Sequence, residues 1–125
     1  MVTGPELRAL MAERMTERQL QDAVRKAAVE NGWLHFHPHD SRRSEPGWPD
    51  SVFVKGDRVL YRELKAAKGR LSPAQRKWLD ALVIAGQDVA IWRPEHSVSG
   101  HIFRVLAGEA DTLILFPGDV LKGKH

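Results

Sequence analysis

The chain has 125 residues, of which 42% are hydrophobic, so it is long and apolar enough for one domain with a packed core. It contains no cysteine, which excludes disulfides and thiolate zinc sites. The net charge of +3 is compatible with a polyanionic partner without requiring one. No segment approaches about 18 consecutive apolar residues. The first residues carry charges in place of an apolar signal core. We therefore expect a cytoplasmic protein with no membrane contact.

Helix signals dominate the first thirty residues. Within an N-terminal extension, 1–15, the segment 4–14 is compatible with a short helix. The signal is stronger over 17–31, where Thr16 and Gln19 have the spacing of a capping box. Apolar residues then recur at helical spacing, namely Leu20, Ala23, Val24, Ala27 and Ala28.

Strand signals follow, interrupted by a polar loop with two prolines. The segment 33–37 reads as a strand, and 51–55 and 58–65 are two further β-rich runs. The link between these two runs is Gly56-Asp57. A glycine first in a two-residue link fits a type II′ turn, so the two runs are predicted to form a β-hairpin.

Another helix opens the second half of the chain. Ser72-Pro73 supplies an N-cap and a first-turn proline, and the segment 88–92 reads as a short buried strand. Beyond it, 102–106 fits either a helix or a strand, and 113–116 fits an edge strand. The order of elements predicts an α/β fold in which helices flank a mixed central sheet.

The hairpin turn also predicts which residues face each other. With Gly56 and Asp57 as the loop, counting outward places Asp50 opposite Glu63, and Lys65 lies on the same face two residues further on. Opposed like charges destabilise a sheet. A divalent cation would offset the repulsion, and two carboxylates suit Mg²⁺ or Mn²⁺ better than zinc. The alternative is a pair of solvated acids at the end of the sheet with a lysine as counter-ion.

The residues around these acids resemble a known nuclease motif. Pro49-Asp50 is followed by Glu63-Leu64-Lys65, an arrangement similar to that of the PD-(D/E)xK nuclease superfamily. The segments GWPDSVFV (47–54) and YRELKAAKGRLSPAQRKWL (61–79), with the helix beginning ERQLQ (17–21), resemble its VRR-NUC group most closely. The resemblance covers roughly 16–93, which we take as the nuclease core, with 94–125 as an extension of the same domain.

This resemblance implies a restriction-endonuclease-like sandwich that hydrolyses phosphodiester bonds with Mg²⁺ or Mn²⁺. It implies that Asp50, Glu63 and the carbonyl of Leu64 bind the metal and that Lys65 is catalytic. It also implies that Gln75 positions water or phosphate, although the spacing of Gln75 from Ser72 equally fits a capping box. Relatives of this size resemble junction resolvases and pair as dimers, so a homodimer is expected.

Glu17 and Gln21 begin the stripe of the first strong helix that otherwise faces the core. We assign Glu17 to the metal site, because the resemblance also has an acid there. The alternative is that a glutamate in a first helical turn only complements the helix dipole.

The expected contacts to DNA are drawn from loops beside the site. They are Gln21, His37, Arg42, Arg43, Trp48, Lys68 and Arg70. Solvated loop charge is the alternative for the basic residues, and packing beneath the loop is the alternative for Trp48. His35, His37 and His39 alternate along the chain, which is compatible with a metal site but fits a polar strand edge better.

The function expected from these residues is that of a DNA endonuclease, selective for branched or junction structures. A non-catalytic nucleic-acid-binding module, or an accessory subunit of a replication or repair complex, remains the alternative.

Overall fold

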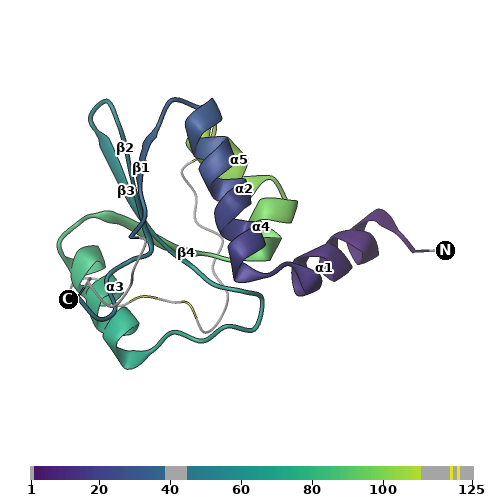
Figure 1. Cartoon of the computed structure of the whole chain (residues 1–125), viewed down its shortest axis with the longest axis horizontal. Helices are drawn as coiled ribbons and strands as arrows, with labels where there is room; N and C mark the ends of the chain where they lie inside the picture. The colour runs from purple at the N-terminus through teal and green to yellow at the C-terminus, as the bar shows by residue number, and fades with distance from the viewer. Residues whose placement is uncertain (1, 39–44, 111–118, 120, 122–125) are drawn as a thin grey trace.

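The structure, a computed structural model, describes residues 2–38, 45–110, 119 and 121. Within these residues the chain forms five helices and four strands, which are labelled in Figure 1. In chain order they are α1 (Gly4–Arg14), α2 (Glu17–Glu30), β1 (Leu34–Phe36), β2 (Ser51–Lys55), β3 (Arg58–Leu64), α3 (Pro73–Ile84), β4 (Asp88–Trp92), α4 (Pro94–Val98) and α5 (His101–Leu106).

The strands form one mixed sheet in the order β1-β2-β3-β4. The first three are antiparallel neighbours, and β4 runs parallel to β3. Helices α2 and α5 cover one face, and α3 packs against β4 on the other (Figure 1). The predicted α/β architecture, with helices flanking a mixed sheet, is confirmed and is consistent with a restriction-endonuclease-like fold.

The main core lies between the sheet and helices α2 and α5. Side chains of α2 enter it at the predicted helical spacing and meet Phe53, Leu60 and Trp92 from three strands. The α2 residues concerned are Leu20, Val24 and Ala28. A smaller core beneath α3 contains Leu79, Val89 and Ile91. The carboxyl end of β3 is therefore enclosed from both sides.

Two predicted helix starts are confirmed by reciprocal capping. Thr16 and Gln19 exchange side-chain-to-backbone hydrogen bonds at the start of α2, and Ser72 and Gln75 do the same at the start of α3. Each pair satisfies two of the backbone N–H groups that a helix start leaves open. The segment 4–14 is helical as expected.

The predicted hairpin register is also confirmed. Lys55 pairs with Arg58, and Val52 pairs with Tyr61, as the two-residue turn requires. Gly56 has a φ of 58°, and Asp57, like every other described residue that is not glycine, has a negative φ, as expected for a type II′ turn. Ser51 and Arg62 are the last pair of this ladder, so Asp50 and Glu63 are the next residues in the same register.

Some element bounds differ from the sequence-based prediction. Strand β1 covers only Leu34–Phe36, because Trp33 is buried and its indole N–H donates to the carbonyl of Leu106 at 2.8 Å. The ambiguous segment 102–106 lies within helix α5, and helix α4, which was not predicted, begins at Pro94, two residues after β4. The expected edge strand at 113–116 lies outside the described residues. None of the helices in the described ranges is long and apolar enough to span a bilayer.

Candidate active site

Asp50 and Glu63 meet at the end of the β2–β3 hairpin. Asp50 directly precedes β2, and its Oδ2 accepts a hydrogen bond from the backbone N–H of Leu64 at 3.0 Å. The carboxyl groups of Asp50 and Glu63 lie close enough to share a hydrogen bond when one of them is protonated, and this contact raises the pKa of Glu63. Two residues that are 13 positions apart in the chain are thus in direct contact.

Glu63 is a carboxyl group enclosed by protein. It is 1% exposed, and its Oε1 has no hydrogen-bond partner within the described part of the chain. Burial raises the pKa of Glu63 to about 10, with further contributions from the hydrogen bond to Asp50 and the charges of Asp50 and Glu17, while Lys65 opposes the rise. Without a cation this group stays protonated at neutral pH.

Lys65 leaves the sheet immediately after Glu63 and Leu64. Its backbone N–H donates to the carbonyl of Trp92 at 3.1 Å, which continues the pairing of β3 with β4. Lys65 is half-buried, and its charge lowers the pKa of both Glu63 and Glu17. Since the N–H and C=O of one strand residue point to the same side, we expect the Leu64 carbonyl on the side of Asp50.

Gln75 caps α3, as one of the two sequence-based interpretations predicted, and its side chain also reaches Glu63. Its Oε1 accepts from the backbone N–H of Ser72 at 2.9 Å and so caps α3. Its Nε2 lies 3.5 Å from Oε2 of Glu63 and donates to it. The capping box holds the amide at the edge of the carboxylate pair.

Glu17 starts α2 and faces the same group of charges. The residue is exposed overall, yet partial desolvation of its carboxyl and the nearby charge of Asp50 raise its pKa. Lys65 and His37 act in the opposite direction. Gln21, one helical turn further along α2, is half-buried in a pocket beside the site.

The two described histidines of the alternating run border this site. His37 Nδ1 donates to the backbone carbonyl of Asp50 at 2.7 Å, and His35 Nε2 lies 3.0 Å from Ser51 Oγ. No group of three or more His, Cys, Asp or Glu side chains in the described ranges has the geometry of a preformed metal site. His35 and His37 thus contact the residues at the start of β2, and His39 lies outside the described residues.

The loop before Asp50 is held against α3. Trp48 is half-buried and meets the rings of Tyr61 and Trp78 edge-on, with centroids 6.0 and 5.2 Å away. Gly47 has a φ of +87°, and a Cβ there would lie 2.3 Å from the backbone of Ala74. Trp48 therefore packs beneath the loop, as the alternative prediction for this residue stated, and its contact with DNA stays a prediction.

The basic candidates for DNA contact differ in their surroundings. Lys68 and Arg70 are exposed in the loop after Lys65, and Lys68 Nζ lies 3.6 Å from Glu13 of α1. Arg42 and Arg43 lie outside the described residues.

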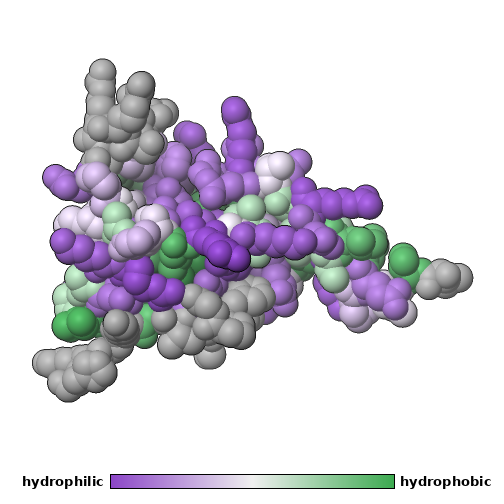
Figure 2. Space-filling model, turned by 90° about the horizontal axis from the view of Figure 1, so that it is seen from below, coloured by the Kyte–Doolittle hydropathy of each residue, from purple (hydrophilic) through white to green (hydrophobic). Residues whose placement is uncertain are grey.

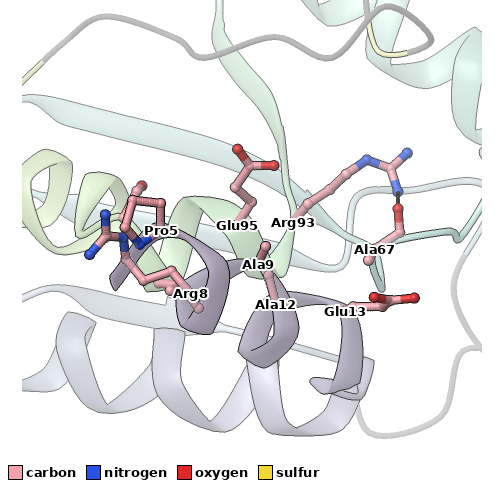
Figure 3. Close-up of a pocket in the computed structure, with 10 residues that line it drawn as sticks. Pro5, Arg8, Ala9, Ala12, Glu13, Ala67, Arg93 and Glu95 are labelled. Atoms are coloured by element: carbon pink, nitrogen blue, oxygen red, sulfur yellow. Dashed lines mark hydrogen bonds between the residues drawn. The ribbon is translucent and has the colours of Figure 1, made fainter. Parts of the chain in front are cut away.

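Arg93 is a residue near the site that the sequence reading missed. It is buried and forms a bidentate ion pair with Asp119 at 2.7 and 2.8 Å. Its Nη1 donates to the carbonyls of Ala66 and Gly69, both at 2.8 Å, and lies 3.4 Å from that of Ala67, the contact drawn in Figure 3. Arg93 thereby holds the loop that follows Lys65. No local motif predicts this, because the partners are 24 to 27 residues away.

A comparison with protein-family models identifies the family of this chain. The VRR-NUC domain model matches residues 6–95, which is well over half of the chain. Searches of curated proteins and of solved structures give no significant match. The chain therefore belongs to the VRR-NUC family and carries a nuclease-type domain.

Proposed function

We propose that this chain is a DNA endonuclease that hydrolyses phosphodiester bonds with bound Mg²⁺ or Mn²⁺. Asp50 and Glu63 would hold the ion, together with the carbonyl of Leu64. Glu17 of α2 does not form a preformed group of three with them, so it would join the set only by moving toward the bound ion. The observation that carries the proposal is the burial of Glu63 in contact with a second carboxyl group, with no hydrogen-bond partner for its Oε1 among the residues that the structure describes.

The alternative of solvated acids fits this burial poorly. A carboxyl kept from water without a full set of partners costs free energy. A divalent cation held there would remove that cost, because it would take the place of the proton on Glu63 and offset the charge of Asp50. The available donors are all oxygens, the ligands that Mg²⁺ and Mn²⁺ prefer.

Each residue then has a defined task. A bound ion would lower the pKa of a water molecule and polarise a phosphate oxygen. Lys65 stabilises the negative charge that develops as the water oxygen bonds to phosphorus and one ester P–O bond breaks. The departing sugar oxygen takes a proton from solvent. Gln75, held by its cap on Ser72, orients the water or a phosphate oxygen through its amide.

The substrate that we propose is branched or junction DNA, cut by a homodimer. One chain offers one such site, whereas paired cuts in a junction need two sites related by symmetry. The exposed Lys68 and Arg70 beside the site suit a phosphate backbone.

A cleavage assay tests this proposal. Four-way junctions, flaps and linear duplexes should be incubated with the protein in Mn²⁺, Mg²⁺ or EDTA. We expect metal-dependent cutting that favours branched DNA, lost in Asp50→Asn and retained in Glu30→Gln, which removes an exposed acid at the end of the same helix that carries Glu17. Binding without cutting under all conditions would instead identify a binding module, and cutting only after a partner is added would identify an accessory subunit.

A further inference from the structure

A polar pocket between α2 and the end of β1 borders the carboxylates and has no task in the chemistry proposed above. Its volume is about 180 Å³. It is lined by Gln21, Asp22 and Arg25 from α2, and by His35, His37 and Ser51 from the sheet. Ser51 directly follows Asp50, and Gln21 lies one helical turn beyond Glu17. Both walls of the pocket therefore continue walls of the carboxylate site.

Arg25 supplies the permanent positive charge of this pocket. Its guanidinium lies near enough to His35 to contribute to the lowered pKa of that imidazole. Within residues 2–38, 45–110, 119 and 121, the Arg25 side chain forms no ion pair or hydrogen bond. An arginine stays charged at any relevant pH and offers a planar set of donors to an oxyanion.

The histidines provide the opposite wall. Because a carbonyl can only accept, the contact with Asp50 requires the proton of His37 on Nδ1, which leaves Nε2 for a ligand. His35 stacks on Phe53 with ring centroids 4.4 Å apart, and burial lowers its pKa to about 4, so this ring is neutral. Asp22 is the single carboxylate in the lining. Whether its replacement tightens or weakens DNA binding therefore depends on which group of the DNA lies in the pocket.

Resting on the proposed nuclease function, we propose that this pocket binds the phosphate next to the scissile one on the cleaved strand, with Arg25 as its charged contact. If the scissile phosphate of a DNA strand lies at Asp50 and Glu63, the next phosphate of that strand must lie along one wall of the site. The pocket at Arg25 starts at that wall, it is polar, and it contains a cation that no described protein group neutralises. Arginine binds phosphate oxygens in a bidentate manner.

The test combines a protein change with a change of one phosphate. After the cut is mapped on unmodified DNA, duplexes are made in which a single neutral methylphosphonate replaces one phosphate at each position near the cut. Binding is measured by fluorescence anisotropy without divalent metal. For the parent protein, one adjacent position should weaken binding about tenfold, the scale of one charge-assisted hydrogen bond.

Arg25→Gln should bind unmodified DNA about tenfold more weakly and should no longer respond to that methylphosphonate. The slope of log affinity against log salt should fall by about 1. Lys26→Gln removes the same charge from an adjacent exposed position outside the pocket and should keep the full response. The proposal is wrong if the two changes weaken binding independently. In that case the affinity loss from Arg25→Gln and the loss from the methylphosphonate would multiply at every position, and Arg25 would not contact the neighbouring phosphate.

Asp22→Asn separates a phosphate from a base in the pocket. Loss of a carboxylate beside a phosphate should tighten binding for all sequences. Weaker binding that depends on the neighbouring base would mean that Asp22 accepts hydrogen bonds from a base, which overturns the proposal. Cleavage of unmodified DNA in Mn²⁺ is scored separately, so that a failed nuclease proposal is distinguished from a failed pocket assignment.

Discussion

Glu63 is almost completely buried, and the described part of the chain offers no hydrogen-bond partner to its Oε1, which is costly for a carboxyl group. Its folded pKa of about 10 lies above the ordinary value of 4.5, so the folded protein holds a proton that the unfolded chain releases. The metal-free protein should therefore lose stability as pH rises from 4.5 toward 10. Such a loss of stability is expected when a carboxyl group is buried to bind a ligand and the ligand is absent.

The first prediction follows from this cost. Glu63→Gln keeps the shape of the protonated acid, so in EDTA at pH 8 its free energy of unfolding should equal or exceed that of the parent. Mn²⁺ at 100 times its dissociation constant should stabilise the parent by about 2.7 kcal/mol and leave the variant unchanged. Urea unfolding with and without metal measures both effects, with Glu30→Gln as the control. A variant that is less stable in EDTA would mean that Glu63 has a structural role.

Replacement of Asp50 and replacement of Lys65 should have different effects on Mn²⁺ affinity and on cleavage. Asp50→Asn removes charge from the proposed ligand set, so Mn²⁺ affinity and cleavage should both fall. Lys65→Ala removes a cation that competes with the metal, so Mn²⁺ should bind as well or better while cleavage falls by about 10²-fold or more. DNA binding should persist in both. Calorimetric titration with Mn²⁺ and single-turnover cleavage test this, and normal cutting by Lys65→Ala would contradict the proposed mechanism.

His35 predicts a pH dependence of stability. Its pKa of about 4 lies below the ordinary value of 6.5, so between these values the unfolded chain binds a proton that the folded protein does not. Stability should fall as pH drops from about 6.5 to 4. After allowance for solvent screening, the loss should be about 1–2 kcal/mol. His35→Gln should flatten the profile in urea unfolding from pH 7 to 4, and an unchanged slope would remove His35 as the cause.

At the scale of elements, the loop before Asp50 depends on a close approach to α3. Gly47 and Gly86 both have positive φ values, +87° and +79°, but only Gly47 has backbone where a Cβ would lie. Gly86→Ala should cost about 1–2 kcal/mol from the left-handed conformation alone. Gly47→Ala should cost more, since a contact at 2.3 Å with Ala74 forces the loop away from the helix. Thermal unfolding of the two variants isolates the clash, and equal losses would show that the loop adjusts freely.

At the scale of the whole molecule, the sheet edge at β1 exposes apolar surface. Leu34 is 74% exposed and Phe36 is 58% exposed, and both lie on the same face as the exposed Val54. Helix α1 extends from the body (Figure 1), and further apolar side chains gather toward its free end (Figure 2). An exposed apolar edge strand favours pairing with another chain.

The proposed homodimer gives a prediction at this scale. Light scattering at tens of micromolar should give the mass of a dimer. Phe36→Lys places a charge on the exposed edge strand and should give a monomer, whereas Phe103→Lys, on the exposed side of α5, should not. A monomeric parent protein, with or without DNA, would contradict the homodimer.

The features that could be predicted from the sequence are those with local causes. The capping boxes at Thr16 and Ser72 involve residues three apart, and the turn at Gly56 sets the register of its own hairpin. Because register propagates along paired strands, a two-residue turn was enough to bring Asp50 opposite Glu63. The helical state of 102–106 was not decided locally, because its apolar pattern fits two structures.

Only the tertiary structure decided how these residues are surrounded. The burial of Glu63 comes from helices packed on both faces of the sheet, and the contact of Arg93 with the loop after Lys65 joins segments more than 20 residues apart. The pocket at Arg25 exists because α2 packs beside the end of β1. Sequence spacing therefore determined which chemical groups share a face, whereas desolvation, the resulting pKa of Glu63 and the shape of the site required the packing of segments far apart in the chain.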